Sequence, residues 1–153
     1  MKLFKVKANY VKLALVEGEQ NKSVSEVRLF EAVSYKDAEN QNTEYIKKYI
    51  AGECEFDIQK VSYDEIVRKE KSDGENEETY WYEMRITFIQ YVGDNNDEKF
   101  INRKILVEAE DLEEAIELAK EHLSDSQDEW FFSKVEETVI EEVIFLNEEK
   151  SEE

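Results

Sequence analysis

The amino-acid sequence contains the same pattern of residues twice, about 77 positions apart. Apolar and polar positions match at every step between Phe4–Tyr10 and Tyr82–Phe88, which lie 78 positions apart. The stretch Glu31–Ala38 matches Glu108–Ala115 at a spacing of 77, and a later match falls at a spacing of 74. Shorter loops between matched elements produce such a drift. A repeated unit of this length predicts two similar pieces of structure, and such scaffolds usually carry a binding surface.

Each copy begins with the alternation that is typical of a half-buried β-strand. In the first copy the alternation starts at Phe4 and changes phase near Val11. In the second copy it starts at Tyr82 and changes phase near Ile89. This shared change of phase predicts a β-bulge in both first strands.

Glycine-containing turns follow both first strands. Gly18 and the run Gly93–Asn96 predict hairpin turns, which lead into second strands at about residues 24–33 and 100–109. Each copy is therefore expected to begin as a β-hairpin.

A capped helix follows each hairpin. Ser34 with Asp37, and Asp111 with Glu114, have the spacing at which two side chains satisfy free N–H groups of a first helical turn. Each helix is expected to turn one face inward. That face is aromatic and partly polar in the first helix, with Ala38, Asn42, Tyr45, Ile46 and Tyr49, and apolar in the second, with Leu112, Ala115, Ile116, Ala119 and Leu123. Third strands at about 55–63 and 129–136 and short strands at 66–67 and 143–146 complete the pattern.

The predicted fold is α+β, with two ββαβ repeats that form a pseudo-symmetric, mainly antiparallel sheet carrying one helix per repeat. The first repeat covers residues 1–67 and the second covers 80–146. A charged linker at 68–79 joins them, and an acidic tail follows at 147–153. The two copies are expected to share a core, either as one continuous sheet or as two sheets packed about a pseudo-twofold axis. This core is expected to bury the aromatic side chains Trp81, Tyr82, Trp130, Phe131 and Phe132.

Negative charge is concentrated in the second copy. The chain has 39 Asp/Glu, 20 Lys/Arg and a formal net charge of −19. Residues 1–77 contain 13 Lys/Arg and 16 Asp/Glu, whereas residues 78–153 contain 7 and 23. Such a field repels nucleic acids and anionic membranes and attracts basic partners. A surface that merely keeps the protein soluble is the alternative interpretation.

Carboxylates of the second copy form a candidate partner-binding surface. Glu113, Glu117 and Glu121 are spaced four apart, so a helix places them in one stripe at a cost of a few tenths of a kcal/mol per like-charge pair. The candidate residues of this acidic face are Glu113, Glu114, Glu117, Glu121, Glu136, Glu137, Glu141 and Glu142.

Residues for chemistry are scarce. One cysteine, Cys54, and one histidine, His122, exclude a zinc site of the usual Cys/His kind and disfavour a nucleophile–histidine pair. The acidic run Asp94–Glu98 lacks the spacing of a calcium loop, and the four glycines do not cluster as in a phosphate-binding loop. We therefore expect no catalytic residue, no metal and no cofactor, and a protein that is not an enzyme.

The sequence predicts a cytoplasmic protein. It has no apolar run of the roughly 18 residues that cross a bilayer, and its N-terminal residues are those of a strand and not of a signal peptide. A lone cysteine agrees with a reducing compartment.

A second candidate surface lies on the first strand. Lysines alternate there with aromatic residues, as on a sheet that binds single-stranded nucleic acid by charge and stacking. The lysines are Lys2, Lys5, Lys7 and Lys12. Because Phe4 and Tyr10 share one face and Lys5 and Lys7 the other, the aromatic rings are expected to line the core.

The runs Glu31–Glu39, Ile50–Glu53 and Ile58–Ile66 resemble a family of uncharacterised small proteins carried by bacteria and their phages. The resemblance is clearest in the first copy, and its motifs are structural. It implies a phage or mobile-element setting, in which small acidic proteins often act by binding another protein. No catalytic residue follows from it.

These patterns favour a non-enzymatic acidic protein-binding module. Its most concrete form is an inhibitor or regulator of a nucleic-acid-binding or host-defence protein, acting through a nucleic-acid-like acidic surface. Two alternatives stay open. One is an accessory single-stranded nucleic-acid-binding protein, and the other is a self-assembling structural protein in which the first copy meets the second copy of another molecule.

Overall fold

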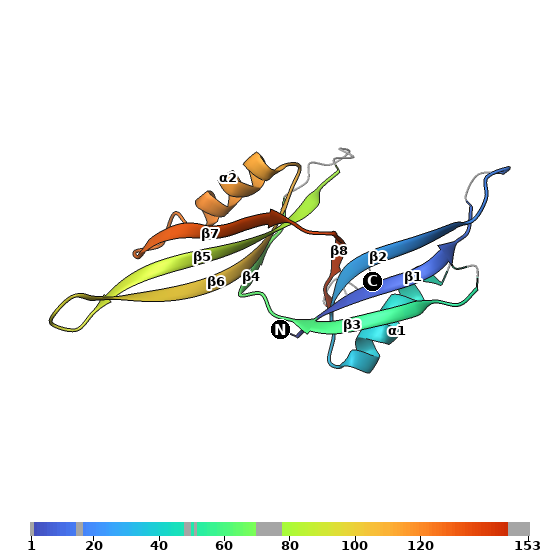
Figure 1. The fold of residues 1–153 in the computed structure, drawn as a ribbon, viewed down its shortest axis with the longest axis horizontal. Helices are drawn as coiled ribbons and strands as arrows, with labels where there is room; N and C mark the ends of the chain where they lie inside the picture. The colour runs from blue at the N-terminus through green and yellow to red at the C-terminus, as the bar shows by residue number, and fades with distance from the viewer. Residues whose placement is uncertain (1, 15–16, 48–49, 51, 70–77, 147–153) are drawn as a thin grey trace. The chain divides into compact units, whose positions relative to one another are not determined.

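A computed structural model describes residues 2–14, 17–47, 50, 52–69 and 78–146 (Figure 1). It confirms the α+β class, with two helices and eight strands in the described part of the chain. The chain divides into two compact units. Unit 1 consists of Met1–Ser62 and Val139–Glu153, and unit 2 consists of Tyr63–Thr138.

Unit 1 is a four-stranded sheet with one helix. Its strands are β1 (Leu3–Lys12), β2 (Lys22–Glu31), β3 (Glu55–Val61) and β8 (Ile140–Ile144), and its helix is α1 (Tyr35–Ile46). The strand order is β3-β1-β2-β8. β1 runs antiparallel to both β2 and β3, whereas β8 runs parallel to β2.

Unit 2 has the same elements in the same arrangement. Its strands are β4 (Glu65–Val67), β5 (Tyr80–Val92), β6 (Asp97–Ala109) and β7 (Glu129–Glu137), and its helix is α2 (Leu112–His122). The strand order is β4-β6-β5-β7, with β4 parallel to β6 and the other pairs antiparallel. The structure thus has two mainly antiparallel sheets.

The two short strands are exchanged between the sheets. β4 follows β3 in the chain but pairs with β6 of unit 2, and β8 follows β7 but pairs with β2 of unit 1. Their registers correspond, because Leu29 lies opposite Val143 and Leu106, 77 positions after Leu29, lies opposite Ile66. The units therefore differ from the predicted segments 1–67 and 80–146 by these strands. Residues 70–77 of the predicted linker and the predicted tail at 147–153 lie outside the described residues.

Both helices begin as the capping pattern predicts. The Ser34 hydroxyl accepts from the Asp37 N–H at 3.1 Å, and the Asp111 carboxylate accepts from the Glu114 N–H at 2.8 Å. Each pair is reciprocal, because the Asp37 carboxylate accepts from the Val33 N–H and the Glu114 carboxylate from the N–H of the residue before Asp111. In each unit, these contacts fix where the chain leaves the second strand and enters the helix.

The expected bulges lie elsewhere. β1 pairs with β2, and β5 with β6, in an uninterrupted register over their whole lengths. The interruption in unit 2 falls in β7 at Ser133, opposite the step from Arg85 to Ile86. The phase change near Val11 marks the approaching end of β1, and the one near Ile89 reflects an apolar residue on the side of the sheet away from α2.

Each unit has its own apolar cluster between helix and sheet. In unit 1, Phe4, Val6, Phe30 and Ala38 pack together, and in unit 2 the cluster centres on Met84 with its neighbours Ile86, Val107, Ala115 and Ala119. Of the aromatic residues expected in the core, Trp81 and Tyr82 are buried, and Trp130 and Phe132 are half-buried.

Three residues expected to face inward are exposed, and a fourth, Tyr49, lies outside the described residues. Tyr45 is 39% exposed because its hydroxyl reaches out from α1 to Glu142. Phe131 is 46% exposed because it alternates with Trp130 and Phe132 and so points to the opposite side of β7. Leu112 is 45% exposed at the first position of α2, where the helix has not yet turned onto the sheet.

Candidate functional site

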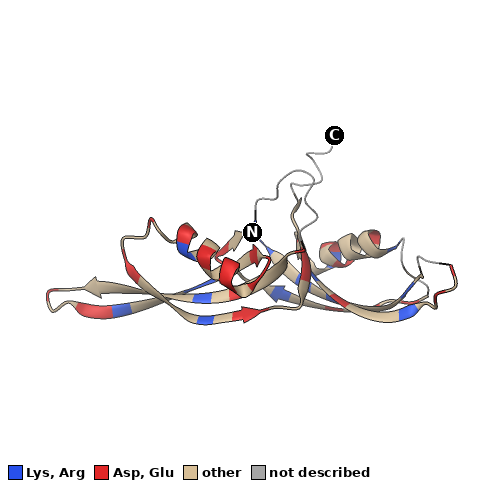
Figure 2. Cartoon of the chain, turned by 90° about the horizontal axis from the view of Figure 1, so that it is seen from above, with Lys and Arg blue, Asp and Glu red and all other residues tan. Residues whose placement is uncertain are grey.

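The carboxylate stripe on α2 is open to solvent. Glu113, Glu117 and Glu121 are all exposed, and Figure 2 shows acidic residues along this helix. Glu114 differs, because it is half-buried, caps the helix and forms an ion pair with Lys69 at 3.0 Å. Only the stripe of three therefore faces outward as a candidate docking surface.

A shallow hollow lies beside this stripe within unit 2. It has a volume of about 720 Å³, and Glu114, Glu117 and Glu121 line it together with Arg68 and Lys69 of the segment after β4. Its lining is thus mixed in charge and open, which is typical of a surface depression and not of a substrate pocket.

The remaining predicted acidic residues lie on two different strands. Glu136 and Glu137 are exposed on β7, and Glu136 forms an ion pair with Lys134 at 3.1 Å. Glu141 and Glu142 are exposed on β8, where both contact residues of unit 1. The eight predicted residues are therefore divided between the two units.

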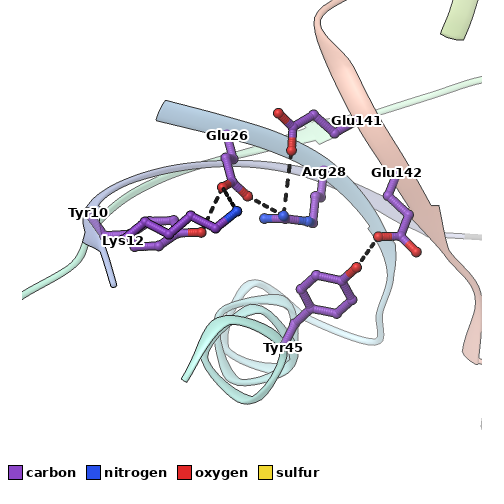
Figure 3. Close-up of polar contacts among 7 residues, drawn as sticks. All are labelled: Tyr10, Lys12, Glu26, Arg28, Tyr45, Glu141 and Glu142. Atoms are coloured by element: carbon purple, nitrogen blue, oxygen red, sulfur yellow. Dashed lines mark hydrogen bonds and ion pairs between the residues drawn. The ribbon is translucent and has the colours of Figure 1, made fainter. Parts of the chain in front are cut away.

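A buried arginine forms the centre of a polar cluster in unit 1 (Figure 3). Arg28 and Glu26 pair with Val6 and Ala8 across the β1–β2 ladder, so both side chains lie on the helix side of the sheet. They are only 8% and 6% exposed, and they form a hydrogen-bonded ion pair. The Arg28 guanidinium also stacks on the Tyr45 ring, 4.6 Å from its centroid. The burial of this pair could not be predicted from the sequence, because charged residues at alternate positions of a strand usually face water.

The surrounding side chains determine the ionisation of this cluster. Burial and the Glu26 carboxylate raise the pKa of Tyr10 to about 12. Burial alone would raise the pKa of Glu26, but the hydrogen bond from Tyr10, 2.8 Å long, and the charge of Arg28 outweigh it and hold that pKa below its usual value. Burial and the hydrogen bond to Glu142 raise the pKa of Tyr45 to about 12.

The cluster fastens β8 to unit 1. The Arg28 guanidinium lies 3.5 Å from the Glu141 carboxylate, and the Tyr45 hydroxyl donates a hydrogen bond to Glu142. An irregularity in the β2–β8 register beside Arg28 makes Glu141 an extra residue in the ladder. The Glu31 carboxylate also accepts a hydrogen bond from the N–H of Leu146, two residues after the end of β8, at 3.1 Å.

Unit 2 fastens β4 with contacts at the corresponding positions. His122, 77 positions after Tyr45, forms a hydrogen bond with Glu65 on β4. Glu108, 77 positions after Glu31, accepts from the Lys69 N–H at 3.3 Å. His122 thus has a structural contact.

The predicted lysine surface keeps its charges but lacks stacking rings. Lys2 and Lys7 are exposed and Lys5 is half-buried, whereas Lys12 lies 3.7 Å from the Glu26 carboxylate. As expected, the interleaved rings of Phe4 and Tyr10 are buried, with 2% and 4% exposure. They are therefore unavailable to stack on bases.

The face of the unit 2 sheet away from α2 carries apolar residues that the sequence analysis did not assign to a surface. Phe100 is 55% exposed, Tyr91 is 54% exposed, and both lie on the same face as Ile89 and Phe131. The only signal in the sequence was the phase of the alternation, which was read as a bulge.

Three findings in the described residues bear on a nucleophile, a metal site and a membrane span. Burial and the neighbouring Glu55 carboxylate raise the pKa of the Cys54 thiol, so the thiol is not activated as a nucleophile. No group of three His, Cys, Asp or Glu side chains suited to a metal ion occurs in the described part of the chain. No described helix has the length and apolar character to cross a membrane.

Two sheets with one helix each define a small α+β protein whose fold alone indicates no chemistry. The chain belongs to the family described as a domain of unknown function (DUF4494), which matches residues 2–146. No curated protein and no solved structure matches the chain.

Proposed function

We propose that this protein is a non-enzymatic binding module whose acidic α2 surface engages a basic protein surface. The observation that carries the proposal is the exposed stripe of Glu113, Glu117 and Glu121, in the half of the chain with 23 Asp/Glu and only 7 Lys/Arg. Like charges one helical turn apart repel each other, so the stripe weakens its own helix. A basic partner would convert that repulsion into attraction.

The spacing suits a partner that normally binds a row of phosphates. Carboxylates one turn apart on a helix follow one another at about 6 Å, and successive phosphates of one nucleic-acid strand are also several ångströms apart. We therefore propose a nucleic-acid-binding or host-defence protein as the partner, inhibited by occupation of its basic groove. The resemblance to proteins of bacteria and phages supports a phage or mobile-element setting, and a cytoplasmic location agrees with it.

We also propose that the scaffold is a pseudo-symmetric pair of ββαβ copies. The shared strand order, the reciprocal caps and the corresponding contacts of β4 and β8 support this proposal. In it, unit 1 supplies the frame, and unit 2 carries the surface that binds.

The test is capture of a partner from host-cell lysate by the tagged protein. In the variant Glu113→Gln/Glu117→Gln/Glu121→Gln, we expect recovery of a basic nucleic-acid-handling protein to fall at least tenfold, and recovery by the unchanged protein to fall steeply between about 50 and 500 mM salt. The matched control neutralises three exposed glutamates of unit 1, Glu17, Glu19 and Glu53, with the same change in net charge. Equal losses for both variants would rule out α2 as the site.

Treatment with nuclease separates the proposed function from the alternative of single-stranded nucleic-acid binding. Capture of a protein that survives nuclease supports the acidic surface. Nucleic acid in the eluate, or loss of all captured material after nuclease, supports single-strand binding by the exposed lysines of β1 instead.

A further inference from the structure

Each unit is completed by a strand from the other sequence copy. We call residues 2–69 the first half of the chain and residues 78–146 the second half. β4 of the first half completes the sheet of unit 2, and β8 of the second half completes the sheet of unit 1. The Lys69 N–H and the Thr79 hydroxyl, on either side of residues 70–77, both donate to the Glu108 carboxylate of unit 2, at 3.3 and 2.6 Å. A break in the chain between these two residues would therefore leave both new ends attached to unit 2.

The second half binds the residues just before β4 through backbone and side chain together. The Asp64 N–H donates to the Lys104 carbonyl, and the Asp64 carboxylate accepts from the Lys104 N–H, both at 2.7 Å. The Tyr63 hydroxyl donates to the Glu83 carboxylate at 2.8 Å. The Lys104 ammonium lies 4.6 Å from the centroid of the Tyr63 ring. Two residues of the first half thus contact β5 and β6 before the ladder of β4 begins.

β4 and the residues after it continue these contacts. β4 pairs in parallel with Ile105–Val107 of β6, and its first residue, Glu65, forms a hydrogen bond with His122 at the end of α2. Beyond β4, the Lys69 ammonium lies 3.0 Å from the Glu114 carboxylate. An extended peptide that adds a strand to the edge of a sheet is recognised in this way, with affinity from the main chain and specificity from the side chains.

The first half binds β8 in the same manner. β8 pairs in parallel with β2, and its residues Ile140 and Val143 are buried, with 6% and 2% exposure. Ile144 packs against the apolar cluster of unit 1. The carboxylates of β8 contact the Arg28 guanidinium and the Tyr45 hydroxyl (Figure 3). Each half therefore donates one strand and accepts one.

We propose that each half of the chain is a specific binding partner for the other half. The two halves then remain one complex after the chain is cut between residues 73 and 74, and halves from two copies of this chain can replace each other. Because a half leaves only when both donated strands are released, the two attachments strengthen each other. The exposed stripe of Glu113, Glu117 and Glu121 takes no part in this recognition, so the proposal is independent of the proposed function.

The first experiment cuts the folded chain at one place. A protease recognition site is inserted between residues 73 and 74 of the full chain and is cleaved after folding. Size-exclusion chromatography at about 1 µM separates halves whose Kd lies well above that concentration. We expect both halves in one peak, at the elution volume of the uncut protein. Halves that elute separately would overturn the proposal.

The second experiment tests whether the donated strands carry the recognition. Isotope-labelled and unlabelled cut proteins are mixed at one urea concentration, chosen so that exchange takes hours, and native mass spectrometry follows complexes with one labelled and one unlabelled half. Glu65→Ala/Glu142→Ala removes a carboxylate contact from each donated strand. We expect its halves to exchange at least about tenfold faster than those of the cut protein without substitutions.

The matched control is Glu113→Ala/Glu117→Ala, which makes the same change in net charge at exposed positions of α2. Its halves should exchange at the rate of the cut protein without substitutions. Far-UV circular dichroism of the uncut variants verifies that both are folded. The proposal fails if no mixed complexes form, or if all three cut proteins exchange their halves at one rate.

Discussion

Unit 1 and unit 2 share a strand order but differ in what lies between helix and sheet. In unit 1 the buried pair Glu26–Arg28 and the buried Asn42 occupy this layer. The positions 77 residues after Arg28 and Asn42 are Ile105 and Ala119, which are buried and apolar. The comparison teaches that the same arrangement of four strands and one helix can enclose either a polar or an apolar interior. In both units the short parallel strand is held at the edge of the sheet.

Both units contain the contacts that hold this strand. Tyr45 binds Glu142 on β8, and His122 binds Glu65 on β4. Unit 1 adds the contact of Arg28 with Glu141, for which unit 2 has an apolar position. The fastening of the fourth strand is therefore shared, and the buried charge is particular to unit 1.

The largest expected effect comes from breaking the buried charge pair. Arg28→Met removes the hydrogen-bonded cation of the buried Glu26 carboxylate, and Lys12 at 3.7 Å replaces only part of that interaction, so we expect a loss of about 3 kcal/mol in the free energy of unfolding. The double variant Glu26→Leu/Arg28→Ile removes both charges together and places at position 28 the residue type that unit 2 has at Ile105, so it should lose less than Arg28→Met. Urea unfolding followed by far-UV circular dichroism measures both.

The matched control uses an arginine of unit 2. Arg103 lies 77 positions after Glu26, is exposed and lies 3.6 Å from the Asp64 carboxylate. Arg103→Met should cost no more than about 0.5 kcal/mol. If it cost as much as Arg28→Met, burial would not be what distinguishes the two units.

A smaller effect is expected from alkaline pH. The pKa of Tyr10 is about 12 in the folded protein, against 10 for an unperturbed tyrosine. The unfolded chain therefore loses this proton more readily, so the contribution of Tyr10 is complete below about pH 10 and declines as pH rises toward 12. The linkage amounts to about 1 kcal/mol at pH 11.

Urea unfolding at pH 9 and pH 11 measures this dependence in the unchanged protein and in Tyr10→Phe. The variant lacks the titrating hydroxyl, so its stability should decline less over this interval, although it also loses the hydrogen bond to Glu26 at both pH values. An equal decline in the two proteins would show that Tyr10 does not carry the alkaline sensitivity of unit 1.

Local patterns predicted much of each unit. The capping residues Ser34 and Asp111 located both helix starts, because a cap depends on residues three positions apart. Alternation located the first strand of each copy, and the glycine turns located the second. It did not show that Phe131 faces away from the helix, since two apolar neighbours hide the phase of β7.

The sequence did not show which sheet each of the short strands β4 and β8 joins. β4 and β8 have only three and five residues. Strands this short fit the edge of either sheet equally well. The choice depends on contacts with residues far along the chain, such as Glu142 with Tyr45. For the same reason, the sequence did not show that the predicted acidic residues are divided between the two units. Glu141 and Glu142 lie on β8, which belongs to unit 1.

The exchange of β4 and β8 is the central structural claim, and a designed disulfide tests it most directly. Val67 on β4 pairs with Val107 on β6, whereas without exchange β4 would pair with β2, where Phe30 lies 77 positions before Val107. In a Cys54→Ser background, Val67→Cys/Val107→Cys and Val67→Cys/Phe30→Cys are oxidised after their folding is verified by circular dichroism. We predict a disulfide within one chain for Val67→Cys/Val107→Cys alone, seen as a mobility shift without reductant and by peptide mass. A disulfide in Val67→Cys/Phe30→Cys, with none in the first pair, would contradict the exchange.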